Sequence, residues 1–141
     1  MNAVIPATAQ DCLTLAKTVW GEARGEDWIG QVQVAHVVIN RLRARKWYGN
    51  TITEVCLKPF QFSCWNANDP NRLLLDDLTL NDCAFQLAMN AALQVIQGIS
   101  FPCGDGTETH YYRVGSPVPK WAIGKRPSFT IGRHCFFSDI D

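Results

Sequence analysis

Residues 9–28 read AQDCLTLAKTVWGEARGEDW, and this stretch decides the first half of the fold. Cys12, Ala16, Val19 and Ala23 recur at the spacing that puts apolar side chains on one face of a helix, so we predict an amphipathic helix over residues 9–23. Asp27 is a suitable N-cap residue for a second helix that begins almost at once. The stretch therefore predicts two helices joined by a short turn.

The second helix is expected to bury a stripe of apolar residues at helical spacing. That stripe contains Ile29, Val32, Ala35, Ile39 and Leu42. The far end of the helix is basic, with Arg41, Arg43, Arg45 and Lys46. Because cations are favoured at the C-terminal end of a helix dipole, we interpret this cluster as helix-end electrostatics in preference to a phosphate site.

Two more helices are expected in the middle of the chain. Thr51 and Glu54 have the spacing of a capping box and predict a short helix that stops near Pro59. Thr79 is expected to cap a long helix that closes at Gly98. The apolar face of that long helix contains Leu80, Ala84, Leu87, Ala91 and Val95.

The last third of the chain changes in character. Glycine, proline and aromatic residues dominate beyond Gly98, and residues 129–137 predict two short strands about Gly132. A length of 141 residues suits one hydrophobic core. We therefore predict a single domain over residues 1–141, of the α+β class, mostly helical with a short late β-hairpin.

The composition excludes several classes of protein. Hydrophobic residues make up 47% and charged residues 18% of the chain, which is typical of a folded domain. Thirteen basic and thirteen acidic residues cancel, so we expect no nucleic-acid partner held by bulk charge. No apolar run is long enough to span a bilayer, so we expect no stable membrane insertion. The first residues lack the pattern of a signal peptide.

The zero net charge hides an asymmetry between two segments. Residues 69–108 contain six acidic residues and one basic residue, a sum of −5, whereas residues 109–138 contain five basic residues and no acidic one, a sum of +5. The two segments could balance each other on the surface. Alternatively, the basic segment could face an anionic polymer.

The cysteines favour no metal site. None of the six forms a CxxC pair, and their spacings with the three histidines match no known ligand pattern. We therefore expect no metal and no other cofactor. Cys12 and Cys83 fall on apolar helical faces and are expected to be buried as small hydrophobic residues.

The turn between the first two helices carries the candidate chemistry. Glu22 and Glu26 lie there, between Trp20 and Trp28. A carboxyl group shielded by an indole loses hydration, which favours its protonated form and suits a general acid that protonates a glycosidic oxygen. On periodicity alone Glu22 could instead be a solvated residue paired with a nearby base, and Glu26 could serve the entry to the second helix.

Six segments together resemble the cell-wall hydrolases of the spore cortex-lytic type. They are LAKTVWGEARGED at 15–27, GQVQVAHVVINR at 30–41, KPFQFSCWN at 58–66, THYYR at 109–113, PKWA at 119–122 and IGRHCFF at 131–137. The resemblance covers nearly the whole chain. It implies a small lysozyme-like fold and cleavage of peptidoglycan glycan strands between N-acetylmuramic acid and N-acetylglucosamine, and some members look like phage or phage-derived lysins.

The resemblance also implies roles for particular residues. It makes Glu22 the catalytic acid, with Gln61 and Ser63 lining the cleft beside it. His110 and Tyr111 match a late His-Tyr pair of the family and would form the opposite wall. Other members tend to have a second histidine where this chain has Tyr112.

A glycan-binding groove needs flat aromatic faces and amide groups. Trp28 and Phe62 are among the candidate aromatic faces, and Glu26 is a further candidate contact to the substrate. Phe60 and Phe62 alternate, so one of them should point into the protein and the other toward the groove.

One carboxyl group suffices for a lytic transglycosylase, which we favour because acidic residues are scarce near the motif. A hydrolytic muramidase would need a second carboxylate, from Glu26, Asp27 or Glu108. A non-catalytic peptidoglycan-binding module is another alternative. An amidase or peptidase would have to use Cys64 with His110 or His134.

We expect a monomer that meets peptidoglycan glycan strands as its partner. With no signal peptide predicted, the chain would be made in the bacterial or host cytoplasm and act on the wall after release, or travel with a virion.

Overall fold

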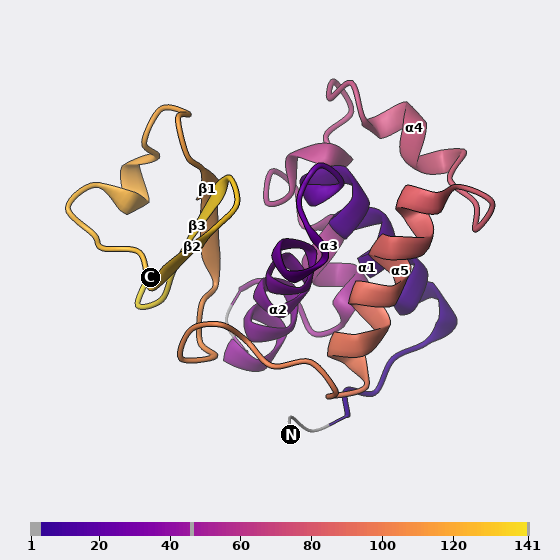
Figure 1. Ribbon diagram of the computed structural model, residues 1–141, viewed down its shortest axis with the longest axis horizontal. Helices are drawn as coiled ribbons and strands as arrows, with labels where there is room; N and C mark the ends of the chain where they lie inside the picture. The colour runs from indigo at the N-terminus through magenta and orange to yellow at the C-terminus, as the bar shows by residue number, and fades with distance from the viewer. Residues whose placement is uncertain (1–3, 46, 141) are drawn as a thin grey trace.

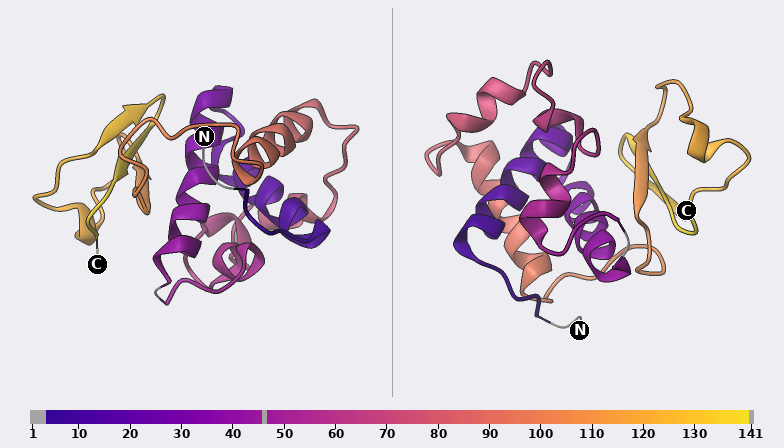
Figure 2. Two further views of the ribbon diagram at one scale, coloured as in Figure 1. Left: turned by 90° about the horizontal axis from the view of Figure 1, so that it is seen from below. Right: turned by 180° about the vertical axis from the view of Figure 1, so that it is seen from behind.

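A computed structural model describes residues 4–45 and 47–140 of the chain. Three helices form the body: α1 (Ala9–Ala23), α2 (Trp28–Ala44) and α5 (Cys83–Ile96). A small sheet lies at one side of this body, next to α2, in all three views (Figures 1 and 2). The short helices α3 (Ile52–Leu57) and α4 (Arg72–Asp76) complete the helical part. None of the described helices is long and apolar enough to cross a membrane.

The first two helices follow the prediction closely. α1 begins after Thr8, whose hydroxyl and backbone exchange hydrogen bonds with Asp11 in a capping box. Asp27 is the N-cap residue of α2, as expected, although its side chain makes no capping hydrogen bond. The predicted stripe of α2 is wrong at Ile29, which is 52% exposed, and the buried stretch begins at Gly30.

The segment before α5 departs from the prediction. Thr79 was expected to cap the helix, but the Asp82 carboxylate accepts the Phe85 N–H and α5 begins at Cys83. The backbone N–H of Asp82 donates to Thr79 O instead, which makes residues 79–82 a turn. The predicted apolar face is confirmed at Ala91 and Val95 but wrong at Leu80, Ala84 and Leu87, which are exposed, and Cys83 is exposed too. The face that packs inward contains Phe85, Ala88, Ala91, Ala92, Val95 and Ile96.

The sheet contains three antiparallel strands. β2 (Phe129–Ile131) and β3 (His134–Phe137) turn at Gly132, which confirms the predicted hairpin, and β1 (His110–Arg113) pairs with the other edge of β3. Gly132 has a φ of 56°, in the left-handed region that favours glycine. The predicted small, mostly helical α+β fold is therefore confirmed, with one strand more than expected.

The two faces of β3 belong to two separate clusters. Phe136 is buried within the main core, together with residues of the helical body. Cys135 and Phe137 point to the other face, where they pack in a small cluster with Ala122 and Ile140. Because neighbouring side chains in a strand alternate between faces, one strand contributes to both clusters.

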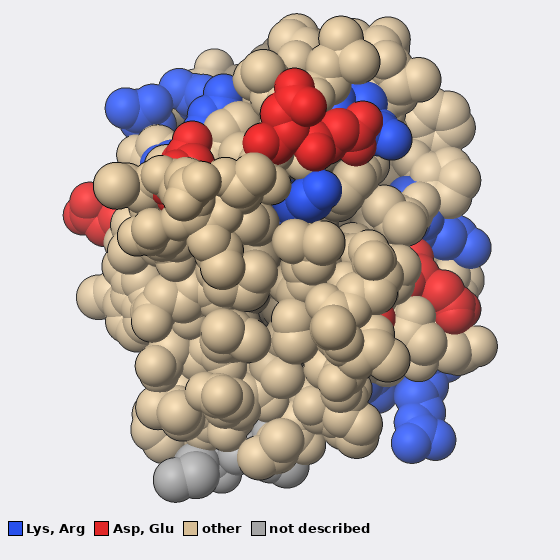
Figure 3. All heavy atoms as spheres, turned by 90° about the vertical axis from the view of Figure 1, so that its right-hand side faces the viewer, with Lys and Arg blue, Asp and Glu red and all other residues tan. Residues whose placement is uncertain are grey.

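The acidic and basic segments do not pair with each other. Among the described residues an ion pair joins Arg72 to Asp76, and the His134 imidazole, which is neutral near pH 7, lies 3.6 Å from the Glu26 carboxylate. Neither contact connects residues 69–108 to residues 109–138. No direct contact among these residues therefore supports the interpretation that the two segments balance each other's charge. Figure 3 shows a face on the α4 and α5 side, where charged side chains lie toward the edges of a broad uncharged area.

Candidate active site

Glu22 lies in the last turn of α1, half-buried, with its carboxylate held from three positions. The Tyr111 hydroxyl donates to Oε1 at 2.7 Å from β1. The Cys64 backbone N–H donates to Oε2 at 3.2 Å, and the Ser63 hydroxyl donates to the same oxygen at 3.4 Å. The sheet and the turn after α3 therefore converge on one carboxyl group, which brings together three of the predicted site residues, Glu22, Ser63 and Tyr111.

Close packing against α1 holds the turn that carries Ser63 and Cys64. A Cβ atom on Gly21 would lie 2.6 Å from the Cβ of Cys64, so only glycine lets the turn approach this closely. The Trp65 indole N–H donates to the Thr18 hydroxyl at 2.9 Å. These two contacts fix the donors to Glu22 on the helix that bears it.

Tyr111 stays protonated in this environment. Burial and the neighbouring Glu22 carboxylate raise the pKa of the Tyr111 phenol well above its usual range. Its ring packs against Phe136, with centroids 5.5 Å apart, and against His134 at 5.1 Å. The phenol is therefore a fixed hydrogen-bond donor to Glu22 throughout the neutral pH range.

Arg41 lies in the last turn of α2, as the helix-end prediction expects, and it also connects α2 to two segments that border the site. It is buried, its Nε donates to Thr109 O at 2.7 Å, and its Nη1 contacts Gln61 Oε1 at 3.4 Å. Its guanidinium also lies over the Phe62 ring, 4.8 Å from the centroid. The helical spacing from Val38 to Arg41 is the signal that could have placed it on the buried face.

Glu26 joins the turn between α1 and α2 to the β2–β3 hairpin. Its Oε1 accepts the Arg133 backbone N–H at 2.6 Å and lies 3.6 Å from His134 Nδ1, and the side chain is only 8% exposed. A Cβ atom on Gly132 would lie 2.6 Å from this oxygen. The carboxylate of Glu26 therefore holds the hairpin, whereas the sequence suggested a role at the entry to the second helix, and among the described residues it makes no capping hydrogen bond to α2.

Glu22 and Glu26 share one hollow of about 70 Å³. The other residues that line it are Ala23, Gly25, Arg113, Arg133 and His134. Burial lowers the pKa of His134, against the opposing effect of Glu26, so this imidazole is neutral near pH 7. The hollow therefore contains two carboxyl groups, a neutral histidine and two arginines.

Several predicted site residues lie elsewhere. Phe62 is only 1% exposed and belongs to the core, so its prediction as a substrate contact is wrong, whereas Phe60 is 85% exposed. The Trp28 indole N–H donates to Asn90 on α5, and its ring lines a different hollow. His110 packs against Trp121, with ring centroids 4.8 Å apart, and is not among the donors to Glu22.

The indole shielding expected for Glu22 is not what surrounds it. Trp20 is buried in the helical core with the Arg24 guanidinium over its ring, 4.2 Å from the centroid. The groups that contact the carboxylate are a phenol, a hydroxyl and a backbone N–H. The Glu22 carboxylate is therefore held by hydrogen-bond donors and is not shielded by an indole ring.

Cys64 is a poor nucleophile in this position. Burial, and then the nearby Glu22 carboxylate, raise the pKa of the Cys64 thiol far above its usual range. Among the described residues no three His, Cys, Asp or Glu side chains are arranged to hold a metal ion. The geometry thus gives no support to a thiol-dependent peptidase at this site.

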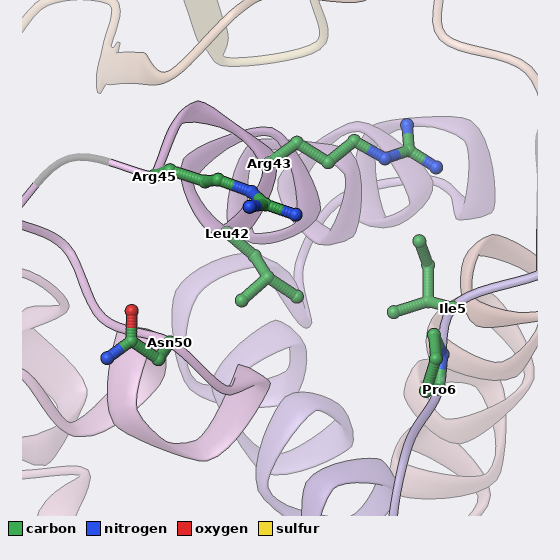
Figure 4. Close-up of a pocket in the computed structure, with 6 residues that line it drawn as sticks. All are labelled: Ile5, Pro6, Leu42, Arg43, Arg45 and Asn50. Atoms are coloured by element: carbon green, nitrogen blue, oxygen red, sulfur yellow. The ribbon is translucent and has the colours of Figure 1, made fainter.

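A second hollow, of about 500 Å³, lies at the far end of α2 (Figure 4). Arg43 and Arg45 extend over Leu42, with Ile5 and Pro6 across the opening. No carboxyl group or imidazole is among the residues that line it, so it contains no group that could transfer a proton near neutral pH. We therefore place the candidate chemistry in the smaller hollow at Glu22.

Two solved catalytic domains have an architecture similar to that of this chain. The catalytic domain of the Bacillus cereus SleB protein superposes with a TM-score of 0.71 and 28% identity, covering 94% of each chain. The catalytic domain of the germination-specific lytic transglycosylase SleB from Bacillus anthracis gives 0.71 and 26%, covering 94% of this chain and 98% of that one. The chain has the fold of these domains.

The sequence pattern of the cell wall hydrolase family matches residues 25–137, and the chain belongs to this family. The matched span begins three residues after Glu22. The spore cortex-lytic enzymes of Halalkalibacterium halodurans and Bacillus cereus are each 32% identical to it over 127 residues, and that of Bacillus subtilis is 29% identical over 128.

The chain spans only part of these curated relatives. The alignments cover 89% of this chain but 34%, 43% and 37% of the three relatives, in the same order. All three are bacterial enzymes, and they give no support to the expected phage origin.

Proposed function

We propose that this chain cleaves the glycan strands of peptidoglycan between N-acetylmuramic acid and N-acetylglucosamine, as a lytic transglycosylase with Glu22 as acid and then base. One observation carries the proposal: the Glu22 carboxyl group borders an open hollow while donors from the sheet and from the turn at Ser63 hold it in place. The solved domain named as a germination-specific lytic transglycosylase has the same fold and supports the same reaction class.

The reaction needs one proton-transferring group. Glu22 donates its proton to the oxygen at C4 of the departing N-acetylglucosamine as the bond from that oxygen to C1 of N-acetylmuramic acid breaks. The Glu22 carboxylate then takes the proton of the C6 hydroxyl of the same N-acetylmuramic acid, whose oxygen bonds to C1. This step leaves a 1,6-anhydro ring, consumes no water and returns Glu22 to its protonated form.

The donors around Glu22 support both steps. When the carboxyl group has lost its proton, the Tyr111 hydroxyl and the Cys64 N–H stabilise the resulting charge from fixed positions. They also hold the side chain in one orientation, which keeps the reacting oxygen directed at the bond to be cleaved. Ser63 is exposed beside the carboxylate and is the residue of this group best placed to contact a sugar.

Hydrolysis is a second candidate because Glu26 lines the same hollow. In that reaction Glu26 would act as the second carboxylate, either on a water molecule or on the sugar. The other two acidic candidates fit less well. Glu108 is buried and accepts the backbone N–H groups of Asp105 and Gly106, and Asp27 is exposed at the start of α2.

Analysis of the released products tests the proposal. Purified sacculi are digested with the protein, and the soluble muropeptides are examined by mass spectrometry. We expect 1,6-anhydro ends, which are 18 mass units lighter than reducing ends because no water is added. Reducing muramic ends would show a hydrolase, free stem peptides would show an amidase, and sedimentation with sacculi without release would show a binding module. Each of these three results would contradict the proposal.

The biological setting is also part of the proposal. The names of the relatives point to the peptidoglycan of the spore cortex as the substrate. Synthesis in the cytoplasm with access to the wall only after release, or delivery on a virion, stays a prediction from the sequence. The proposed mechanism uses no cofactor.

A further inference from the structure

Two arginines border Glu22, and the proton transfers above do not use them. Arg113 ends β1 and Arg133 directly precedes β3, and both line the hollow that contains Glu22 and Glu26. Both side chains are exposed. Within residues 4–45 and 47–140, neither guanidinium forms an ion pair or a hydrogen bond. Two unpaired positive groups therefore stand beside the candidate catalytic carboxyl group.

The backbone fixes both arginines while their side chains remain free. Arg113 pairs with His134 across β1 and β3, and the Val114 N–H donates to Arg133 O at 2.7 Å. The Arg133 N–H donates to Glu26 at 2.6 Å. That carboxylate holds the hairpin backbone, is 8% exposed and forms no ion pair with either guanidinium group among the described residues, so it offsets only part of their charge.

The charge of the hollow is positive in the reactive form. Two arginines contribute +2 and Glu26 contributes −1, while Glu22 contributes nothing when it holds the proton that it must donate. The sum is therefore +1, with His134 neutral. The surrounding segment 109–138 contains three more basic residues and no acidic one. An anionic group of the substrate is thus attracted to the site at the stage when Glu22 is ready to act.

We propose that Arg113 and Arg133 form a carboxylate-binding subsite for the acidic substituent of the muramic acid residue. The inference rests on the proposed function. The lactyl group at C3 of muramic acid carries a carboxyl group that is either free or extended into a stem peptide with further carboxylates, whereas N-acetylglucosamine has none. Guanidinium groups bind carboxylates through paired N–H donors.

The size of the hollow fits such a group. Its volume of about 70 Å³ exceeds the roughly 10–15 Å³ that one water molecule needs, so the hollow has room for a carboxylate group. Because only every second sugar carries the acid, this subsite fixes the register of the strand. It thereby determines which of the two alternating glycosidic bonds lies over Glu22.

Binding measurements on a protein silenced by Glu22→Gln test the subsite separately from catalysis. The ligands are peptide-bearing glycan strands, strands stripped by an amidase to leave free lactyl carboxylates, and chitohexaose, which has no carboxylate. Arg113→Gln with Arg133→Gln is compared with Lys125→Gln plus Arg126→Gln. The control pair removes the same charge from the same basic segment, at exposed residues that do not line the hollow. Thermal melting verifies that every variant folds.

We expect the Arg113 and Arg133 pair to weaken binding of peptide-bearing strands about tenfold, and the control pair by less than about twofold. Chitohexaose binding should differ little among the variants. Equal weakening on stripped strands assigns the contact to the lactyl carboxylate, and weakening confined to peptide-bearing strands assigns it to the stem peptide. Unchanged binding of both strands, or equal weakening by the control pair or for chitohexaose, would overturn the subsite. A failure of the proposed function would instead appear in the product analysis, which this binding assay does not use.

Discussion

The helical body and the three-stranded sheet are stabilised in different ways. α1, α2 and α5 bury a continuous apolar core, from Leu15 to Val95, with the shape of each buried face set by helical spacing. The sheet adds Phe136 to that core and packs Tyr111, Phe129 and Ile131 against it, partly buried. Hydrogen bonds also join the sheet and the residue before β1 to the helices: Tyr111 to Glu22, Arg133 to Glu26, and Thr109 to Arg41. These polar contacts lie at or beside the candidate active site.

This difference links stability to function in the smaller region. The sheet contributes only one fully buried side chain, Phe136, to the main core, so the sheet should be the more easily perturbed part. Changes in the helical core should lower the stability of the whole domain. Changes at the hydrogen bonds between the sheet and the helices should alter the site and have a smaller effect on the free energy of unfolding.

The largest expected effect on stability comes from the core beneath the site. We expect Phe62→Ala to lower the free energy of unfolding by about 3–5 kcal/mol, because it leaves a cavity at a side chain that is 1% exposed. Phe60→Ala removes the neighbouring ring, 85% exposed, and should change the same quantity by less than about 0.5 kcal/mol. Urea unfolding measures both. Equal effects would show that Phe62 is not a core residue.

The next largest effect is a loss of stability at acidic pH, which we expect from His36 in the helical body. Burial, and then Arg43, lower the pKa of His36 to about 4. In the unfolded chain, where the histidine pKa is about 6.5, His36 takes up a proton as the pH falls below 6.5, whereas in the folded protein it stays neutral until about pH 4. Its contribution to the free energy of unfolding is therefore fully present above pH 6.5 and is lost as the pH falls to 4. The loss should be roughly 3 kcal/mol. Urea unfolding across this range should show a flatter profile for His36→Gln, and an unchanged profile would contradict the assignment.

A smaller effect on stability is expected from Arg41, which connects α2 to the segment before β1. Arg41→Met keeps the apolar stem of the side chain but removes the donors to Thr109 O and Gln61. We expect a loss of about 2 kcal/mol of unfolding free energy, together with lower activity, because the segment leading to Tyr111 loses an anchor. Arg43→Met, at an exposed position on the same helix, is the control. A stability equal to that of the parent protein would rule out Arg41 as a connection between the two regions.

Glu26→Gln should have the smallest effect on stability. The amide oxygen can still accept the Arg133 N–H but without its negative charge, so we expect a loss of about 1 kcal/mol. Chemical unfolding measures this loss. Continued release of anhydro products by the variant would separate the transglycosylase from a hydrolase that needs Glu26 as its second carboxylate.

The sequence predicts the helical body better than the site. Apolar spacing and the N-cap candidate Asp27 are local signals, so α1 and α2 lie where periodicity places them. Glu22 could be selected as the candidate acid from the motif that contains it. Arg41 was missed because its partners lie 20 and 68 residues away, and no local pattern shows that such partners exist. The start of α5 was missed because Thr79 and Asp82 are both good caps.

The orientation of the turn at residues 60–63 could not be decided from sequence either. Alternation predicts that Phe60 and Phe62 point in opposite directions, which the structure confirms, but not which of them is buried. Long-range packing against Arg41 makes that choice. The same holds for His110 and Tyr111, where pairing with β3 directs Tyr111 to Glu22 and His110 to Trp121.

The most direct test is the rate at which Glu22→Gln releases anhydro-muropeptides from purified sacculi. The amide keeps the size of the side chain and can still accept the Tyr111 hydroxyl, but it cannot donate a proton to the leaving oxygen. We expect a melting temperature close to that of the parent protein and a rate of release lower by about a thousandfold. The control is Glu54→Gln, which changes an exposed glutamate on α3 and should leave the protein fully active. Release by folded Glu22→Gln at the parent rate would contradict the assignment of Glu22 as the acid.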